Sequence, residues 1–177
     1  STNDMVLCLA NGMSGAKEIR EDSMELEEFQ SLLEYVCLSL AKMIVRDGEG
    51  ATKFVTITVD NARNFKDAKK IAMSVGRSLL VKTAFFGEDA NWGRFMAAIG
   101  YSGVMVDEGK VDIYYGGVKI VDSGIGAGRR ADLLASRVLK KKEFSVRIDL
   151  KAGKEKATVW TTDLSHDYVR INASYRS

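Results

Sequence analysis

A glutamate between two glycines is the residue of this sequence best placed for chemistry. Glu49 lies between Gly48 and Gly50, where a helical pattern ends and a strand pattern begins. Glycine lets the backbone adopt positive φ angles and lets other groups approach closely. Glu49 could therefore be a fixed carboxylate, facing a cationic substrate group or taking part in proton transfer. The residues alone leave a second interpretation open, in which Gly48 ends the helix and Glu49 is a solvated loop residue.

A glycine-rich stretch with two arginines, GIGAGRR at residues 124–130, is a second candidate. Backbone amides and arginines at the start of a helix can bind phosphate. The third glycine follows the second by two residues instead of three, so the stretch departs from the dinucleotide-binding fingerprint, and it lacks the Lys-Ser/Thr of a P-loop. A structural glycine turn is the favoured interpretation.

Two further residues invite a catalytic interpretation and fail to support it. His166 is the single histidine and has no cysteine nearby, so it cannot form a zinc site by itself and is expected to be structural or solvated. No Gly-x-Ser-x-Gly elbow accompanies it, which argues against a Ser-His-Asp triad. Ser1 could use its own amine as a base if it were a free N-terminus. The Ser1–Asp4 segment also fits an ordinary loop or cap.

The elements around Glu49 are predicted by two periodicities. Apolar residues recur every three or four positions and predict a helix from about Met24 to Arg46; they are Leu26, Phe29, Leu33, Val36, Leu40 and Ile44. The β-branched alternation of residues 54–60 predicts a strand directly after the glycines. Glu49 is therefore expected in a short helix-to-strand connection.

The remaining sequence interleaves predicted helices and strands. Helical patterns cover residues 68–79, 95–99 and 133–139. Buried strands are predicted at Met5–Ala10 and at Val81–Phe86, and a strand-like tail at Tyr168–Asn172. Two hairpins are predicted, at 110–115 with 118–121 around Gly116-Gly117, and at 144–150 with 157–162. The class is α/β or mixed α+β, and residues 1–177 are expected to form a single domain.

The composition indicates an ordinary globular protein. Hydrophobic residues make up 46% and charged residues 28%, which argues against disorder. The formal charge of +2 is too small to indicate nucleic acid or a membrane surface as a partner. Cys8 and Cys37 lie in apolar segments and are expected to be buried free thiols in a reducing compartment. A cytoplasmic protein is the expectation.

Four stretches, in this order and at these distances, carry a family resemblance. They are Ser1–Asp4 leading to Leu9–Gly12, then Asp47–Lys53, then Lys82–Arg94 (KTAFFGEDANWGR), and Asp163–Ser177. Together they resemble the C-terminal part of the bifunctional ornithine acetyltransferase (glutamate N-acetyltransferase) family of arginine biosynthesis. The resemblance spans nearly the whole chain.

The resemblance implies a precursor that cleaves itself into α and β chains. The fold would be a sandwich of sheets flanked by helices, like that of DmpA and the ornithine acetyltransferases. The nucleophilic threonine would begin the β chain upstream of Ser1, and the oxyanion-hole Thr-Gly pair and a substrate-binding lysine would lie in the α chain. No catalytic nucleophile is therefore expected in this chain, although Glu49 could act as an acid or base. An α2β2 heterotetramer is implied, with residues 1–177 as the C-terminal portion of β.

Three residues match substrate contacts of that family: Glu49, Asn172 and the terminal Ser177. The family usually has threonine at the last place, and serine keeps the hydroxyl. Ala173-Ser174-Tyr175 replaces the more usual Ala-Asp-Tyr, which affects none of the three.

The implied reaction moves an acetyl group from N-acetylornithine to glutamate through an acetyl-threonine ester, with no metal or other cofactor. Some members also accept acetyl-CoA. Two alternatives stay open: a related self-processing amidohydrolase or aminopeptidase, and a non-catalytic amino-acid-binding subunit.

Overall fold

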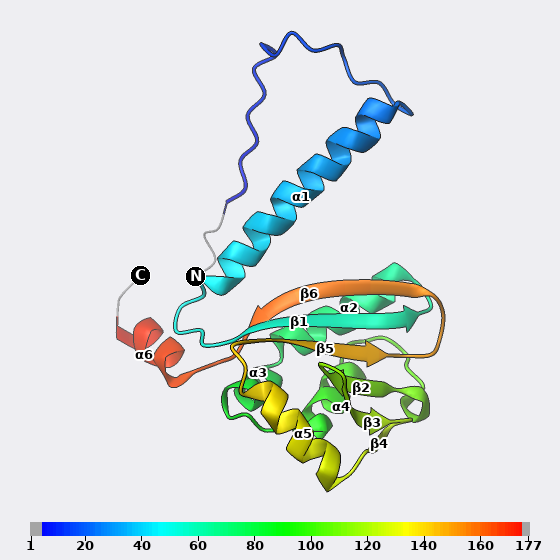
Figure 1. Ribbon diagram of the computed structural model, residues 1–177, viewed down its shortest axis with the longest axis vertical. Coiled ribbons are helices and arrows are strands. Elements are labelled where there is room, and N and C mark those ends of the chain that lie inside the picture. The colour runs from blue at the N-terminus through cyan, green and yellow to red at the C-terminus, as the bar shows by residue number, and fades with distance from the viewer. Residues whose placement is uncertain (1–4, 175–177) are drawn as a thin grey trace. The chain divides into compact units, whose positions relative to one another are not determined.

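The computed structural model describes residues 5–174, which fall into two units, one ending at Leu40 and the other beginning at Ala41. Helix α1 (Met24–Arg46) runs across the division, and its bounds confirm the predicted helix. The sheet and all other helices belong to the second unit (Figure 1). The interpretation of residues 1–177 as one domain remains a prediction.

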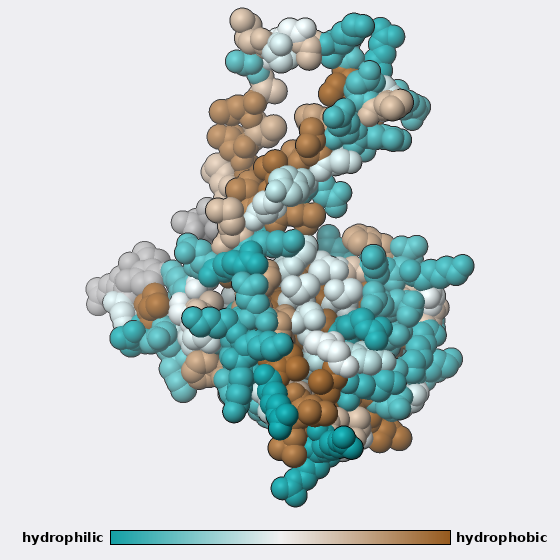
Figure 2. Space-filling model, in the orientation of Figure 1, coloured by the Kyte–Doolittle hydropathy of each residue, from teal (hydrophilic) through white to brown (hydrophobic). Residues whose placement is uncertain are grey.

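Residues 5–40, the described part of the first unit, contain no buried residue. The predicted buried strand at Met5–Ala10 is wrong, because these residues are exposed and have no regular secondary structure. A strand needs a neighbour for its backbone groups, and no described strand takes that place. Cys8 and Cys37 are exposed as well, so the prediction of buried thiols is wrong. Figure 2 shows apolar side chains gathered over this segment and α1, of which no residue is buried.

The second unit is built on a six-stranded sheet of order β4-β3-β2-β5-β1-β6, which confirms the mixed α/β class. The strands are β1 (Phe54–Ala62), β2 (Asp112–Tyr115), β3 (Val118–Asp122), β4 (Ile125–Gly126), β5 (Glu143–Asp149) and β6 (Glu155–Thr162). The hairpin predicted between the last two is wrong. β1 lies between them, parallel to β5 and antiparallel to β6, so each pairs with β1 instead of with the other.

One face of the sheet carries the helices and the core. These helices are α2 (Phe65–Arg77), α3 (Leu79–Phe86), α4 (Trp92–Gly100) and α5 (Arg129–Leu139). Val55, Ile57 and Val59 alternate along β1 and are fully buried, whereas Thr58 on the opposite face exchanges a hydroxyl hydrogen bond with Thr158. This alternation is typical of a sheet with one covered face. Within the described residues, no helix is long and apolar enough to cross a membrane.

The apolar run Val81–Phe86, predicted as a strand, is helix α3. The Ser78 hydroxyl accepts a hydrogen bond from the backbone nitrogen of Val81 at 3.4 Å and caps the helix. Val81, Ala84 and Phe85 are buried, at helical spacing. The same cap separates α3 from α2, where the sequence predicted one helix over residues 68–79. A short buried apolar run is compatible with either a strand or a helix, and here the Ser78 cap favours the helix.

The glycine-rich stretch at 124–130 is a turn only in part: it turns at Gly124, continues as strand β4 and ends in the first residues of α5. Gly124 has a φ of +79°, and a methyl carbon there would lie 2.3 Å from the carbonyl oxygen of Glu108, at the start of the short 3-10 helix η1 (Glu108–Lys110). Only glycine fits such a position. The hairpin around Gly116-Gly117 is confirmed as β2–β3.

A buried carboxylate, Asp112, joins three segments at one end of the sheet. It accepts hydrogen bonds from Lys151 Nζ at 2.8 Å, Lys119 Nζ at 2.9 Å and the backbone nitrogen of Ser123 at 2.8 Å. Burial by itself would raise the pKa of this carboxyl group, but these donors outweigh burial and hold its pKa well below the usual range. The charged form of Asp112 therefore stabilises the fold.

Candidate substrate-binding site

Two of the three predicted site residues meet in the structure. The side-chain nitrogen Nδ2 of Asn172 donates a hydrogen bond to Glu49 Oε2 at 2.9 Å, across 123 positions of sequence. The same amide donates to the backbone oxygen of Tyr168 at 2.9 Å, which orients it. The third residue, Ser177, lies outside the described residues. The roles of all three as substrate contacts remain predictions.

Asn172 comes from a helix, so the strand predicted at Tyr168–Asn172 is wrong. Helix α6 (His166–Ser174) begins after Ser165, whose hydroxyl accepts a hydrogen bond from the backbone nitrogen of Tyr168 at 3.2 Å. A serine before the first helical residue is a common N-cap. The alternation of apolar and polar residues favoured a strand, but the capped helix satisfies its own backbone and puts Tyr168 and Asn172 one turn apart.

Gly50 fixes the distance between the Glu49 loop and α6. Its φ is +65°, and a methyl carbon there would lie 2.5 Å from the backbone nitrogen of Tyr168 and 2.9 Å from the carbonyl carbon of Asp167. Real side chains do not approach a backbone so closely, so this contact needs glycine both for its conformation and for its size. The Ser165 hydroxyl donates a hydrogen bond to the Gly50 carbonyl oxygen and joins the two segments.

Asp163 anchors the other end of the Glu49 loop. Its side chain is buried, with the residue 3% exposed, and accepts hydrogen bonds from the backbone nitrogens of Thr52 at 2.8 Å and Lys53 at 3.0 Å. The Thr52 hydroxyl donates to its second oxygen. Hydrogen bonds to a carboxylate are stronger than neutral ones. The chain before α6 therefore holds the loop at both Gly50 and Thr52.

The lysine of the KTAFFGEDANWGR stretch, Lys82, lies beside this anchor. Burial lowers the pKa of Lys82, and the nearby Asp163 carboxylate opposes that effect by raising it. The Lys82 carbonyl accepts a hydrogen bond from the backbone nitrogen of Leu164 at 3.2 Å. One turn along α3, Phe86 packs edge-to-face on the exposed His166 ring at 5.3 Å between centroids. His166, expected from the sequence to be structural or solvated, is thus an exposed residue that packs on Phe86.

Sequence reasoning missed the roles of Asp163, Ser165 and Lys82. The signal for Ser165 was present, because a serine followed by polar residues is typical of a helix start. Asp163 gave no comparable signal, since its partners lie 110 and 111 positions away.

The arrangement can bind a polar, charged ligand group. Glu49 supplies an exposed carboxylate suited to an ammonium group, and Asn172 orients that carboxylate through its side-chain nitrogen. Among residues 5–174, no three histidine, cysteine or carboxylate side chains gather in a way that could hold a metal ion.

Comparison with known proteins identifies the family. The ArgJ family matches residues 1–177. The chain is 54% identical over 177 residues to the arginine biosynthesis bifunctional protein ArgJ of Geobacter sulfurreducens, and 55% identical to that of Syntrophotalea carbinolica. In both cases the match covers 100% of this chain and 45% of the relative. The chain thus spans about half the length of these curated relatives.

A solved structure agrees in both fold and sequence. The crystal structure of the arginine biosynthesis bifunctional protein ArgJ from Bacillus halodurans superposes with a TM-score of 0.89 at 37% identity. The match covers 99% of this chain and 82% of the solved chain. The chain therefore belongs to the ArgJ family.

Proposed function

We propose that this chain is the C-terminal portion of the β chain of a glutamate N-acetyltransferase. The complete enzyme transfers the acetyl group of N2-acetyl-L-ornithine to L-glutamate and yields L-ornithine and N-acetyl-L-glutamate. The observation that carries the proposal is the hydrogen bond between Glu49 and Asn172, two residues that match substrate contacts of the family. The names of the relatives, which place them in arginine biosynthesis, support it.

The proposed chemistry is a two-step acyl transfer. The hydroxyl of a threonine upstream of residue 1 attacks the acetyl carbonyl, ornithine leaves as the free amine, and the acetyl group stays on the threonine as an ester. The glutamate amine then attacks this ester and releases the threonine hydroxyl. Backbone and hydroxyl donors of the α chain stabilise the oxyanion in both steps. Acetyl-CoA is proposed as an additional donor that would acylate the same threonine.

This chain's part in the reaction is to bind and orient the amino-acid substrates. Glu49 faces an ammonium group of ornithine or glutamate, and can accept or return a proton there. Asn172 donates to the Glu49 carboxylate and to the Tyr168 carbonyl, and so holds Glu49 in position for the substrate. Ser177 is proposed to add a hydroxyl. Gly50, by its close backbone contact with α6, and Asp163, by its side-chain hydrogen bonds to the loop, set the spacing between Glu49 and Asn172.

The proposed partner is the α chain, in an α2β2 assembly located in the cytoplasm. The exposed apolar surface of the first unit supports a partner, because monomeric proteins rarely leave so much contiguous apolar surface uncovered. Val6, Leu9 and Met24 are more than four-fifths exposed, and the apolar stripe of α1 includes Phe29, Val36 and Leu40 at 49–50% exposure. The first unit would then complete its packing against the rest of the protein.

The acceptor of the acetyl group separates this proposal from a hydrolase. The complete assembly is incubated with N-acetylornithine, with and without glutamate, and ornithine, acetate and N-acetylglutamate are quantified. We expect steady ornithine release only when glutamate is present, with N-acetylglutamate in equal amount. Fast acetate release that is independent of glutamate would identify an amidohydrolase and overturn the proposal.

A second experiment separates an enzyme from a non-catalytic binding subunit. Residues 1–177 alone are expected to be inactive, and activity is expected to return with the α chain and a β chain that begins at the upstream threonine. Mass and N-terminal sequence of the native polypeptides would identify that threonine. Turnover by residues 1–177 alone would contradict the assignment, and an inactive complete assembly would favour the binding subunit.

A further inference from the structure

A cavity in the second unit lies away from Glu49 and Asn172 and has charged walls over an apolar floor. It has a volume of about 250 Å³, opens to solvent, and is bounded by the end of β1, the start of α2, the segment 104–107, η1 and the residues after β5. The floor is formed by Ala62 and Leu150, which are 1% and 4% exposed, with Val104 and Val106 packed on the core beside them.

One wall of the cavity forms where the irregular end of β1 and the segment after β5 lie against each other through their backbones. The carbonyl oxygen of Asn61 accepts hydrogen bonds from the backbone nitrogens of Ala152 and Gly153, both at 2.8 Å. Asn61 and Lys151 have positive φ angles of 54° and 48°, which are uncommon for residues other than glycine. A methyl carbon at Gly153 would lie 2.2 Å from the Ala62 carbonyl oxygen. Strained backbone held in this way is found at ligand-binding sites, and it gives the cavity a rigid wall.

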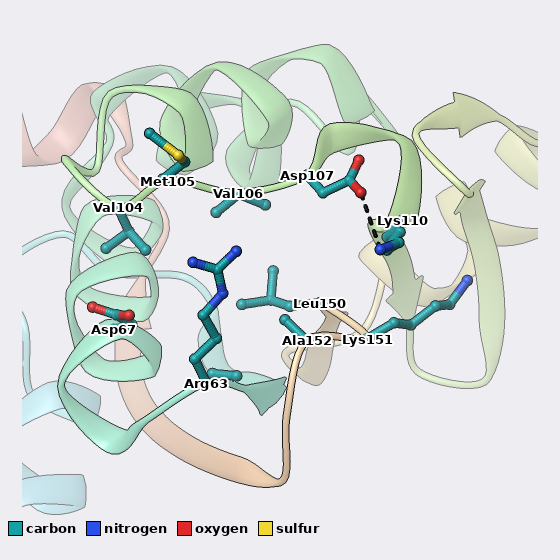
Figure 3. A pocket seen from close by; sticks show the side chains of 11 residues that line it. Arg63, Asp67, Val104, Met105, Val106, Asp107, Lys110, Leu150, Lys151 and Ala152 are labelled. Carbon is teal, nitrogen blue, oxygen red and sulfur yellow. Dashed lines mark ion pairs between the residues drawn. The ribbon is translucent and has the colours of Figure 1, made fainter.

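The charges in the cavity leave one cation and one anion without an oppositely charged partner. Lys110 pairs with Asp107 at 3.2 Å, and Lys151 pairs with Asp112 at 2.8 Å. Arg63 and Asp67 form no ion pair within residues 5–174, with each other or with any other side chain. Figure 3 shows the Arg63 side chain rising into the middle of the cavity, with its guanidinium among the surrounding side chains.

Asp67 contributes a negative charge to the cavity, and one of its carboxylate oxygens is hydrogen-bonded at the start of α2. Its Oδ2 accepts a hydrogen bond from Asn64 Nδ2 at 2.9 Å at the start of α2. This bond occupies one of the two carboxylate oxygens, and the charge itself stays unpaired. The cavity therefore presents a guanidinium, a carboxylate and an apolar floor to the same small volume.

From this geometry we propose that the cavity binds a zwitterionic amino acid with an aliphatic side chain. The Arg63 guanidinium holds the ligand's carboxylate, because its planar fork matches a carboxylate with two parallel hydrogen bonds. Asp67 faces the ligand's ammonium group, and the aliphatic side chain lies against Val104, Val106 and Leu150. The site does not depend on the proposed acetyl transfer, since none of its residues belongs to the Glu49 site.

The probe for this proposal is norvaline, titrated calorimetrically into the complete assembly. Pentanoate lacks the ammonium group of norvaline, and butylamine lacks the carboxylate. We expect norvaline to bind, and each of the other two to bind at least about tenfold more weakly, because one charged group of the site is left unpaired. Absence of norvaline binding, or pentanoate or butylamine binding as tight as that of norvaline, would overturn the proposal.

Variants locate the binding. Arg63→Gln and Asp67→Asn should each weaken norvaline binding at least about tenfold, and Arg63→Lys should fall between Arg63→Gln and the unaltered protein. Asp67→Asn keeps a side-chain oxygen that can accept from Asn64, so the helix start is preserved. Arg77→Gln, at the other end of α2, is the matched control and should change nothing. Thermal unfolding checks that each variant is folded.

A last variant excludes the substrate site as the place of binding. Asn172→Ala should leave norvaline affinity unchanged. Affinity that falls with Asn172→Ala, or that survives Arg63→Gln, would mean that norvaline occupies the substrate site or another place, and would refute the cavity as its binding site.

Discussion

Replacing Gly50 by alanine tests whether the spacing between the Glu49 loop and α6 matters for activity. The added methyl carbon would lie 2.5 Å from the Tyr168 nitrogen, whereas ordinary contacts begin near 3.4 Å. The loop or α6 must therefore move by roughly 1 Å, which is the scale at which misplaced groups lose up to about 100-fold in rate. The hydrogen bond between Glu49 and Asn172 joins the loop to α6, so this movement would displace it.

A second glycine provides a matched control. Gly103 also has a positive φ, +75°, but no atom lies within 4 Å of a methyl carbon added there. Gly103→Ala and Gly50→Ala therefore share the cost of a left-handed alanine, about 1–2 kcal/mol. Only Gly50→Ala adds the clash and weakens the Ser165 hydrogen bond to Gly50, worth about 0.5–1.5 kcal/mol.

Steady-state kinetics of the complete assembly, with both amino-acid substrates varied, measures the difference. We expect Gly50→Ala to lower kcat/KM by about 10- to 100-fold and Gly103→Ala to leave it nearly unchanged. The thermal midpoint should fall in both variants, and more in Gly50→Ala. If the two variants have the same kinetics, the reasoning that α6 and the Glu49 loop form one site is refuted.

Three further predictions follow from the same structure. Asn172→Ala should remove a hydrogen bond worth about 0.5–1.5 kcal/mol and so raise KM for the amino-acid substrates by about two- to twelvefold. Glu49→Gln should raise KM more, because the charge itself is lost. An unchanged KM in both variants would contradict their role. Asp163→Ala leaves two backbone N–H groups unpaired, at a cost of about 1–3 kcal/mol each. Its thermal midpoint should therefore fall further than that of Asp163→Asn, which keeps an acceptor. Equal midpoints would count against the role of Asp163 as the anchor of the loop. The lowered pKa of Asp112 means that its stabilising effect is complete above the unfolded-state pKa of about 4 and is lost as the pH falls toward the folded-state pKa. Asp112→Asn should therefore be less stable at neutral pH and lose less stability on acidification, as followed by thermal midpoints; parallel pH profiles of the two proteins would oppose this.

Local patterns were sufficient where an element's own side chains decide its structure. The three- and four-residue spacing of apolar residues predicted α1 with its observed bounds, and Gly116-Gly117 predicted the β2–β3 hairpin. The alternation of residues 54–60 predicted most of β1. Each of these signals depends on residues close together in the chain, so no knowledge of distant partners was needed.

The candidate site was only partly readable in this way. The glycines on either side of Glu49 marked it as a special carboxylate, and family resemblance added Asn172 and Ser177. Two further features depend on contacts between residues more than 100 positions apart. Helix α6 approaches Gly50 closely enough to exclude a side chain there, and Asp163 holds the Glu49 loop by hydrogen bonds. No spacing rule connects such positions.

The sequence by itself determined which segments are apolar and where glycines allow turns. The interleaving of helical and strand patterns between those turns was enough to predict the α/β class. Tertiary structure decided what the short apolar runs become. Val81–Phe86 is a helix because Ser78 caps it over the core, and Tyr168–Asn172 is helical because Ser165 caps it against Gly50. The strands β5 and β6 both pair with β1, since strand pairing satisfies backbone groups regardless of distance along the chain. Short runs carry too little local preference to resist such contacts, so their structure follows from their partners.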